Sequence, residues 1–454
     1  MTRTDIPNAR SVFHLAWPMA LKAMMLHGIT VIDAYLVSSL GEEALAAMGL
    51  ASAITGLVLG FLFAFSSATQ IRIAQAFGAE DAQRLKSGFY CGLIINLVVA
   101  AMGLLLIALS GAQIIEAFAH SPQVAEQAMG YLTVFTFVIV FEAVSLCFAN
   151  HFNGCGKTQL PLIGYAFGMP VNIVLSIALI HGLYGLPALG LTGAAAGSAV
   201  ASLLQMVFLG ALFYRANRGY RDVPGWTNGP LSYALKRHLL FSLPIAATFA
   251  SVAVSNQVCM LIYAKMSIHE FAAMTLIMPW VMVGGTLGMS WAQATGILVA
   301  QLLGKQQSHA VLDRFLSQAW RMSFVAAACV AAVYAGVCLA SPRLYSELEP
   351  ATTNALLSLL PLALLLPFPK QSNAICGNTL RASGDTVYVM NVFVGAQWLF
   401  KVPAVALFVL YFDLSVFWVF SILFLDELVK FAPFHLRTFK GGWKTLREEE
   451  PAAA

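Results

Sequence analysis

Charged residues are scarce in this sequence. Only 10% of its 454 residues are Asp, Glu, Lys or Arg, whereas a soluble globular domain carries roughly 25%. Hydrophobic residues make up 59%, and the mean hydropathy is +0.78. These values exclude an ordinary soluble domain and indicate a chain that crosses a membrane many times. We therefore expect the lipid bilayer as a partner. The net charge is only +4, so we expect no binding to nucleic acid.

Motifs for metal, phosphate or catalysis are also missing. The seven cysteines include no CxxC pair, so we expect no disulfide framework and no metal site. The run HFNGCGKT resembles the end of a phosphate-binding loop, but His151 stands where its first glycine is required. No other group of residues suggests catalysis. We therefore predict that the protein is not an enzyme and needs no cofactor.

Long apolar stretches are abundant instead. A bilayer core of about 30 Å needs roughly 20 apolar residues per helix, and twelve stretches meet this requirement. The first is too long for a cleaved signal peptide, so we keep it as a membrane helix. The twelve expected spans are 11–37, 45–70, 88–110, 126–150, 160–181, 190–214, 238–264, 271–300, 317–340, 353–376, 387–411 and 414–434.

Basic residues are distributed unevenly between the expected loops. If the N-terminus is cytoplasmic, 19 of the 25 Lys and Arg residues fall on the inside, and only Lys265 and Arg343 fall outside. This bias is typical of membrane proteins that keep their positive loops inside. It predicts a multi-pass protein with both termini in the cytoplasm.

The sequence repeats itself at one constant offset. ALAAMGL at 44–50 matches EFAAMTL at 270–276, ATQIRIAQAFG at 68–78 matches ATGILVAQLLG at 294–304, and the same offset takes Pro18 to Pro244. Six helices per half would give both halves the same orientation. Transporters built from such parallel repeats place their sites near the middle of the membrane. We predict an N-lobe at 1–225, which ends in a basic linker, and a C-lobe at 226–454, which ends in a cytoplasmic tail.

Ionisable residues within the spans are candidates for function because they are costly in hydrocarbon. Asp33 stands alone in HGITVIDAYLVSSLG, and we interpret it as a proton or sodium site; a buried acid satisfied by neighbouring polar groups is the alternative. Lys22 lies eleven residues earlier, on nearly the same helix face but roughly 16 Å away along the axis. Glu142 is a candidate for a proton relay or for pairing with Lys22.

Two further groups allow a functional or a structural interpretation. Asn172 and Ser176 share a helix face, and their oxygens suit a hard cation; hydrogen bonding between helices is the alternative. Asp426, Glu427 and Lys430 cluster in the last span, where we expect a structural role, as we do for Lys401.

In WPMAL, VIDAYLVSSLGEEALAAMGLA, GCGKTQLP, PVNIVLS, LRASGDT and WLFKVP, the chain resembles the multidrug and toxic compound extrusion (MATE) family. The resemblance covers about residues 10–445. It implies an all-α integral membrane fold of twelve helices in two six-helix repeats around a central cavity. It also implies export of organic, often cationic, compounds by antiport with H⁺ or Na⁺.

The resemblance also implies roles for individual residues. Asp33 falls on the coupling acid of the N-lobe, and Asn172 on the Asn that accompanies it. Many members carry an acid where this chain has Ser176, which favours a proton over a tightly bound sodium. Lys370 stands where one branch has an acid. With Asn373 it is expected to line the C-lobe face of the cavity, together with Lys22 on the other side.

We therefore predict a monomeric efflux transporter of a bacterial inner membrane, with a small organic substrate. Glu142 is the second candidate for coupling after Asp33. A lipid-linked oligosaccharide flippase of the same wider superfamily is the main alternative, although it should have more cations in its cavity. An embedded enzyme would need converging catalytic groups, and a channel would need a filter segment. Neither feature is visible in the sequence.

Overall fold

The structure, a computed structural model, describes residues 7–344 and 349–446. Within these ranges the chain is almost entirely helical and contains no β-sheet. Arg3 and Arg447, which belong to the predicted inside charges, lie outside the described residues. The side chains of Arg221 and Arg343 are not described either.

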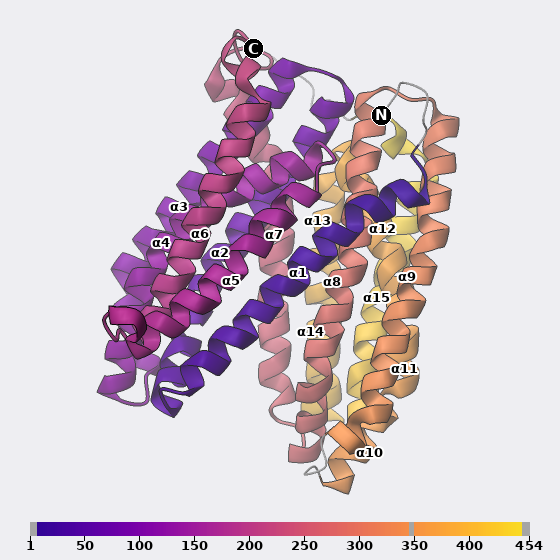
Figure 1. The fold of residues 1–454 in the computed structure, drawn as a ribbon. Coiled ribbons are helices and arrows are strands. Elements are labelled where there is room, and N and C mark those ends of the chain that lie inside the picture. The colour runs from indigo at the N-terminus through magenta and orange to yellow at the C-terminus, as the bar shows by residue number, and fades with distance from the viewer. Residues whose placement is uncertain (1–6, 345–348, 447–454) are drawn as a thin grey trace. The chain divides into compact units, whose positions relative to one another are not determined.

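Six long helices make up the first half of the chain (Figure 1). They are α1 (Ala9–Ser38), α2 (Glu42–Gly78), α3 (Ala82–Phe118), α4 (Pro122–Gly154), α5 (Gln159–His181) and α6 (Leu191–Ala216). Polar caps define several starts, since Asp81 accepts a hydrogen bond from the Arg84 N–H and Ser121 from that of Val124. The 3₁₀ helices η1 (Leu183–Gly185) and η2 (Arg218–Arg221) lie in connecting segments.

The second half contains more interruptions. Its helices are α7 (Leu231–Tyr263), α8 (Ile268–Gly304), α9 (His309–Leu344), α10 (Pro350–Ser358), α11 (Leu360–Leu365), α12 (Pro367–Ser383), α13 (Thr386–Gly395), α14 (Val402–Ala406) and α15 (Val416–Phe439). Two π-helical segments, η3 (Ala396–Lys401) and η4 (Leu407–Tyr411), flank α14, and the 3₁₀ helix η5 (Gly442–Lys444) follows α15.

Proline lies at several of these interruptions. The expected single span 353–376 is a helix pair that bends by 42° between Leu365 and Pro367, because proline lacks an N–H and clashes with the preceding turn. Pro403 lies in α14, where the expected span 387–411 stays continuous and has π-helical turns on either side.

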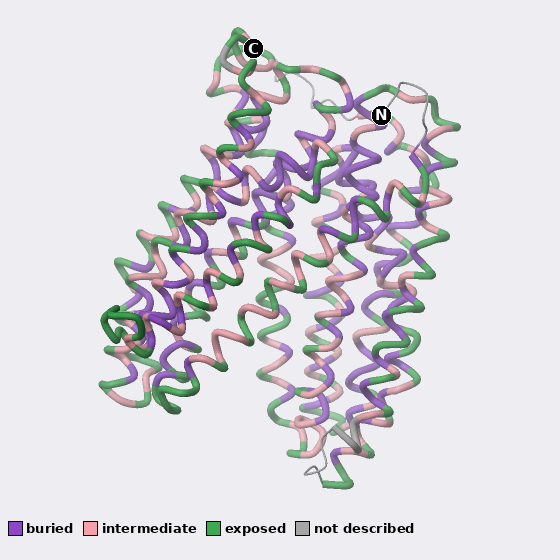
Figure 2. The backbone as a smooth tube through the Cα atoms, in the orientation of Figure 1, coloured by how far each residue is buried: buried purple, intermediate pink, exposed green. Residues whose placement is uncertain are grey.

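Apolar side chains cover the outside of the helices as well as the core. Leu109, Phe118 and Leu399 are 70%, 70% and 84% exposed, and exposed residues line the outer faces in Figure 2. Ten described helices are long and apolar enough to cross a membrane, or eleven segments if the bent pair counts as one. The all-α, multi-pass membrane fold is therefore confirmed. The count of twelve and the two six-helix repeats stay predictions.

The bounds of the helices recur at the offset found in the sequence. Helix α8 starts and ends a fixed number of residues after α2 starts and ends. This number equals the separation between Pro18 and Pro244. Just past the ends of these helices, Glu80 and Gln306 are related by the same offset. Both have a left-handed backbone, with φ of 55° and 52°. Few non-glycine residues adopt this conformation, so its recurrence supports a duplicated origin.

Contacts divide the chain into two compact units. The N unit is Leu21–Leu243, and the C unit combines Met1–Ala20 with Pro244–Ala454. Both boundaries fall inside helices, close to Pro18 in α1 and at Pro244 in α7. The lobe boundary between residues 225 and 226 stays a prediction.

Candidate functional site

The N unit contains a cavity of about 510 Å³. Side chains from α1, α2, α4, α5 and α6 line it. Its polar or ionisable lining residues are Lys22, Thr30, Asp33, Ser52, Thr55, Tyr131, Glu142, Tyr165, Asn172, Ser198, Ser202 and Gln205. Four of the seven predicted site residues, Lys22, Asp33, Glu142 and Asn172, thus come together on one surface.

Asp33 and Asn172 each present an oxygen atom without a donor. The Oδ1 atoms of both side chains are buried and accept no hydrogen bond from any described residue. The Asn172 amide is fixed at its other end, where Nδ2 donates a hydrogen bond of 2.8 Å to Ser198 Oγ. Because a buried acceptor without a partner is unfavourable, this arrangement suits a proton or another small cation.

Ser176 Oγ is also buried without a hydrogen-bond partner among the described residues, but it lies between two helices and not on the cavity wall. A Cβ atom at Gly197 would lie 2.8 Å from the Ser176 backbone nitrogen, and one at Gly193 would lie 2.6 Å from the Leu179 carbonyl group. These glycines form a GxxxG pattern that lets α6 approach α5 closely. Ser176 is completely buried in this contact and is not among the lining residues of the cavity. Its role as an ion ligand stays a prediction.

The second acid of the cavity has a cationic neighbour. Glu142 accepts a hydrogen bond of 3.3 Å from Ser202 Oγ and interacts electrostatically with Lys22. The Lys22 ammonium also lies 5.2 Å from the centroid of the Tyr165 ring, within the range of a cation–π contact. Among its lining residues, the cavity therefore contains one acid with a cationic neighbour, Glu142, and one acid without such a neighbour, Asp33.

Aromatic and thioether side chains complete the wall. Tyr131, Phe135 and Tyr165 line the cavity together with Met48 and Met169. Such walls bind flat apolar molecules, and aromatic faces also attract cations.

Sequence reasoning missed several lining residues. The tyrosines gave no signal because aromatic residues are common throughout the chain. Ser198, Ser202 and Gln205 do follow a helical spacing of four and three residues, which marks one polar face of α6.

Lys370 and Asn373 belong to the C unit and lie in a network of buried charges. Asn373 Nδ2 donates hydrogen bonds of 2.7 Å to the backbone oxygen of Glu427 and 2.9 Å to its Oε2. Lys370 interacts electrostatically with Glu427, and its ammonium fills the space beside Gly285. Whether these residues line a substrate path in the C-lobe stays a prediction.

The remaining intramembrane charges of the C unit have partners. Lys430 Nζ lies 2.8 Å from both Asp426 Oδ2 and Glu427 Oε1, and Lys401 donates a hydrogen bond of 2.6 Å to Asn256. This geometry is that of a structural network. In the part of the chain that the structure describes, no three His, Cys, Asp or Glu side chains are placed to hold a metal ion.

Comparison with known sequences gives consistent matches. A family model described as MatE matches residues 18–178 and 244–407. The "Probable multidrug resistance protein NorM" of Bradyrhizobium diazoefficiens is 32% identical over 189 residues, which are 42% of this chain and 40% of that protein. Its namesake in Deinococcus radiodurans is 26% identical over 86% of each chain. The chain spans only about two fifths of the length of the first curated relatives it matches.

Solved structures share the fold. A MOP superfamily transporter from Pyrococcus furiosus aligns with a TM-score of 0.82 over 97% of this chain and 98% of its own, at 18% identity. The eukaryotic MATE transporter AtDTX14 aligns with a TM-score of 0.81 over 96% of each chain, at 20% identity. At these identities the likeness concerns the fold alone.

Proposed function

The chain belongs to the MatE family, and on this premise we propose that it is a secondary active exporter of small organic molecules, cationic ones among them. In this proposal an ion moves inward as the substrate moves outward. We also propose that the protein is a monomer in a bacterial inner membrane, with both termini in the cytoplasm. The relatives' names describe transporters and resistance proteins, which supports a transport role over an enzymatic one.

Asp33 is the proposed coupling residue. The observation that carries the proposal is the pair of unpartnered oxygens, Asp33 Oδ1 and Asn172 Oδ1, in a cavity with aromatic walls. Ion binding at Asp33 would favour one facing state of the transporter, and substrate binding would favour the other. Such exchange requires that each ligand bind the two states with different affinity.

We propose the proton as the coupling ion, with Na⁺ as the alternative. A hard metal cation gathers several oxygen ligands, and Ser176 is buried against Gly197 instead of lining the cavity beside Asp33. A proton needs only the carboxyl group itself. Glu142, held by Ser202 and Lys22, is the proposed second carrier on the proton path.

The charge of the cavity argues against the flippase alternative. A pyrophosphate-linked substrate would need several cations to bind its phosphates. Lys22 is the one Lys or Arg among the lining residues, and Glu142 offsets its charge.

The test is export of ethidium, an aromatic cation, by purified protein in liposomes under a pH gradient or a Na⁺ gradient imposed separately. We expect wild-type export under the pH gradient and background export for Asp33→Asn, which should remain folded. Glu116→Gln, which neutralises an exposed acid on α3, is the matched control and should export normally. Full export by Asp33→Asn, or wild-type export under neither gradient, would overturn the proposal.

A further inference from the structure

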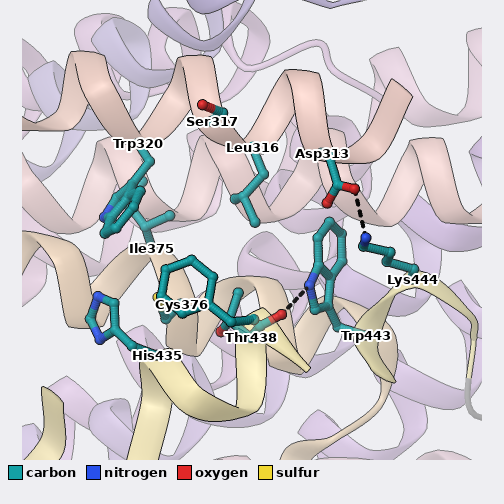
Figure 3. Close-up of a pocket in the computed structure, with 11 residues that line it drawn as sticks. Asp313, Leu316, Ser317, Trp320, Ile375, Cys376, His435, Thr438, Trp443 and Lys444 are labelled. Atoms are coloured by element: carbon teal, nitrogen blue, oxygen red, sulfur yellow. Dashed lines mark hydrogen bonds and ion pairs between the residues drawn. The ribbon is translucent and has the colours of Figure 1, made fainter. Parts of the chain in front are cut away.

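A second pocket lies entirely within the C unit, where α9 begins and α15 ends. Its volume is about 250 Å³, below the roughly 300 Å³ at which pockets for drug-sized ligands begin. Figure 3 shows Trp320 and His435 at one end, and Trp443 beside the ion pair of Asp313 and Lys444 at the other. The size limits a ligand to about one or two fused rings.

The nitrogen atoms of the aromatic wall are already engaged within the wall. Trp320 Nε1–H donates to Ser372 Oγ at 2.8 Å, and Ser372 Oγ lies 2.7 Å from His435 Nε2. His435 Nδ1 lies 2.7 Å from the Phe431 carbonyl oxygen. A carbonyl can only accept, so Nδ1 carries a hydrogen, and Nε2 has the serine hydroxyl as its partner.

The second indole is held in the same way. Trp443 is 2% exposed, and its Nε1–H donates a hydrogen bond of 2.9 Å to the Thr438 carbonyl oxygen. The N–H groups of both indoles and of the imidazole thus stay within the wall. Trp320 is half-buried and offers its indole face to a ligand, whereas Trp443 is almost completely covered and the imidazole stacks on the Phe431 ring, with 3.7 Å between the ring centroids. The electron-rich face of an indole attracts cations more strongly than that of any other side chain.

An acid stands at the mouth of this aromatic pocket. The Asp313 side chain is 58% exposed, and its Oδ2 lies 2.6 Å from Lys444 Nζ. The Lys444 side chain is only 19% exposed, but the carboxylate itself faces solvent, so a cationic ligand can reach it and compete with the lysine ammonium. The Lys444 ammonium and a cationic ligand would thus compete for the Asp313 carboxylate.

We propose that this aromatic pocket binds a planar aromatic cation of one or two fused rings. The ring would lie against the indole of Trp320, and its positive charge would face Asp313. This site is lined by other residues than the N-unit cavity, and its binding does not depend on the proposed transport function.

The test measures binding of N-methylquinolinium by equilibrium dialysis against the full-length protein in nanodiscs. The background is Asp33→Asn, so the result does not depend on whether coupled transport occurs. Neutral quinoline, at a pH where it is unprotonated, is the matched ligand of nearly the same shape. We expect saturable binding of the cation and weaker binding of quinoline; equal binding of both, or saturable binding of neither, would overturn the proposal.

The two partners of the ion pair should have opposite effects. Asp313→Asn should weaken cation binding by about two- to fivefold, the range set by an exposed charge pair. Lys444→Met should strengthen it by a similar factor, because the competing ammonium is gone. Lys440→Met removes an exposed charge nearby and should leave affinity unchanged. Unchanged affinity in Asp313→Asn, or weaker binding in Lys444→Met, would overturn the assigned role of the carboxylate.

Discussion

Asn172 on α5 donates its amide hydrogen to Ser198 on α6 over 2.8 Å, and this bond decides which end of the amide faces the cavity. With Nδ2 engaged, Oδ1 is left as an acceptor without a donor. Asp33 presents a second such oxygen from α1. The coupling site proposed here therefore depends on a residue of α6 that carries no charge.

Replacing Ser198 tests this dependence. In Ser198→Ala the amide of Asn172 loses its anchor and can rotate, so a donor instead of an acceptor can face the cavity. A neutral hydrogen bond contributes about 1 kcal/mol, and we expect proton-driven ethidium export to fall about fivefold. Ser110→Ala is the control, since the Ser110 hydroxyl donates to the Leu106 carbonyl oxygen within α3. Equal initial rates for both variants in liposomes would contradict this role of Ser198.

The close contact of α5 and α6 can be tested by adding one methyl group. Gly193→Ala would place its Cβ 2.6 Å from the Leu179 carbonyl group, so α6 must shift away from α5. We expect a loss of about 1–3 kcal/mol in stability, the usual cost of overpacking, together with lower export. Gly49→Ala in α2 meets no atom within 4 Å and should be neutral or slightly stabilising. Thermal unfolding of the two purified variants distinguishes these outcomes.

The sequence indicates the candidate acid more directly than the residues that surround it. Asp33 stands out in the sequence because a carboxylate in an apolar span is costly. The internal repeat is visible both in the amino-acid sequence and in the helix bounds. Asn172 and Ser176 were predicted to act together because four residues make nearly one helical turn. Both residues face α6, but Asn172 lines the cavity and bonds to Ser198, whereas Ser176 is buried where Gly197 brings α6 close to α5.

Other features of the fold depend on contacts that spacing cannot reveal. The expected span 353–376 bends before Pro367, and proline alone does not fix where a membrane helix breaks. Asp426, Glu427 and Lys430 could be predicted to pair because they lie three and four residues apart. The bond from Asn373 to Glu427 joins residues 54 positions apart and could be found only from the folded chain.

Lys22 and Glu142 should depend on one another in stability. Each is half-buried, so removing one leaves an opposite charge without compensation. We expect Lys22→Met and Glu142→Gln each to lower the apparent unfolding temperature. In the double variant, the decrease should be smaller than the sum of the two single decreases. Thermal unfolding of all four proteins completes the cycle. Strictly additive losses would mean that the two side chains do not interact.

Lys430 should be the most sensitive position of the C-unit network. It bridges Asp426 and Glu427 at 2.8 Å, and its side chain is only 3% exposed. In Lys430→Met two carboxylates remain buried without their cation, which typically costs about 3–5 kcal/mol. The fraction of protein that stays monodisperse after heating measures this loss. Lys440→Met, at an exposed lysine beyond α15, is the control.

A companion variant separates this charge effect from the loss of packing. Lys430→Met combined with Asp426→Asn, Glu427→Gln and Lys370→Met also neutralises the lysine that faces Glu427, and it keeps similar side-chain volumes. We expect this quadruple variant to be more stable than Lys430→Met alone, because a neutral buried amide is less costly than a buried carboxylate that has lost its cation. If Lys430→Met matched the Lys440→Met control, the network would contribute little to stability. If the quadruple variant were no more stable than Lys430→Met, packing around the lysine stem would be the dominant contribution.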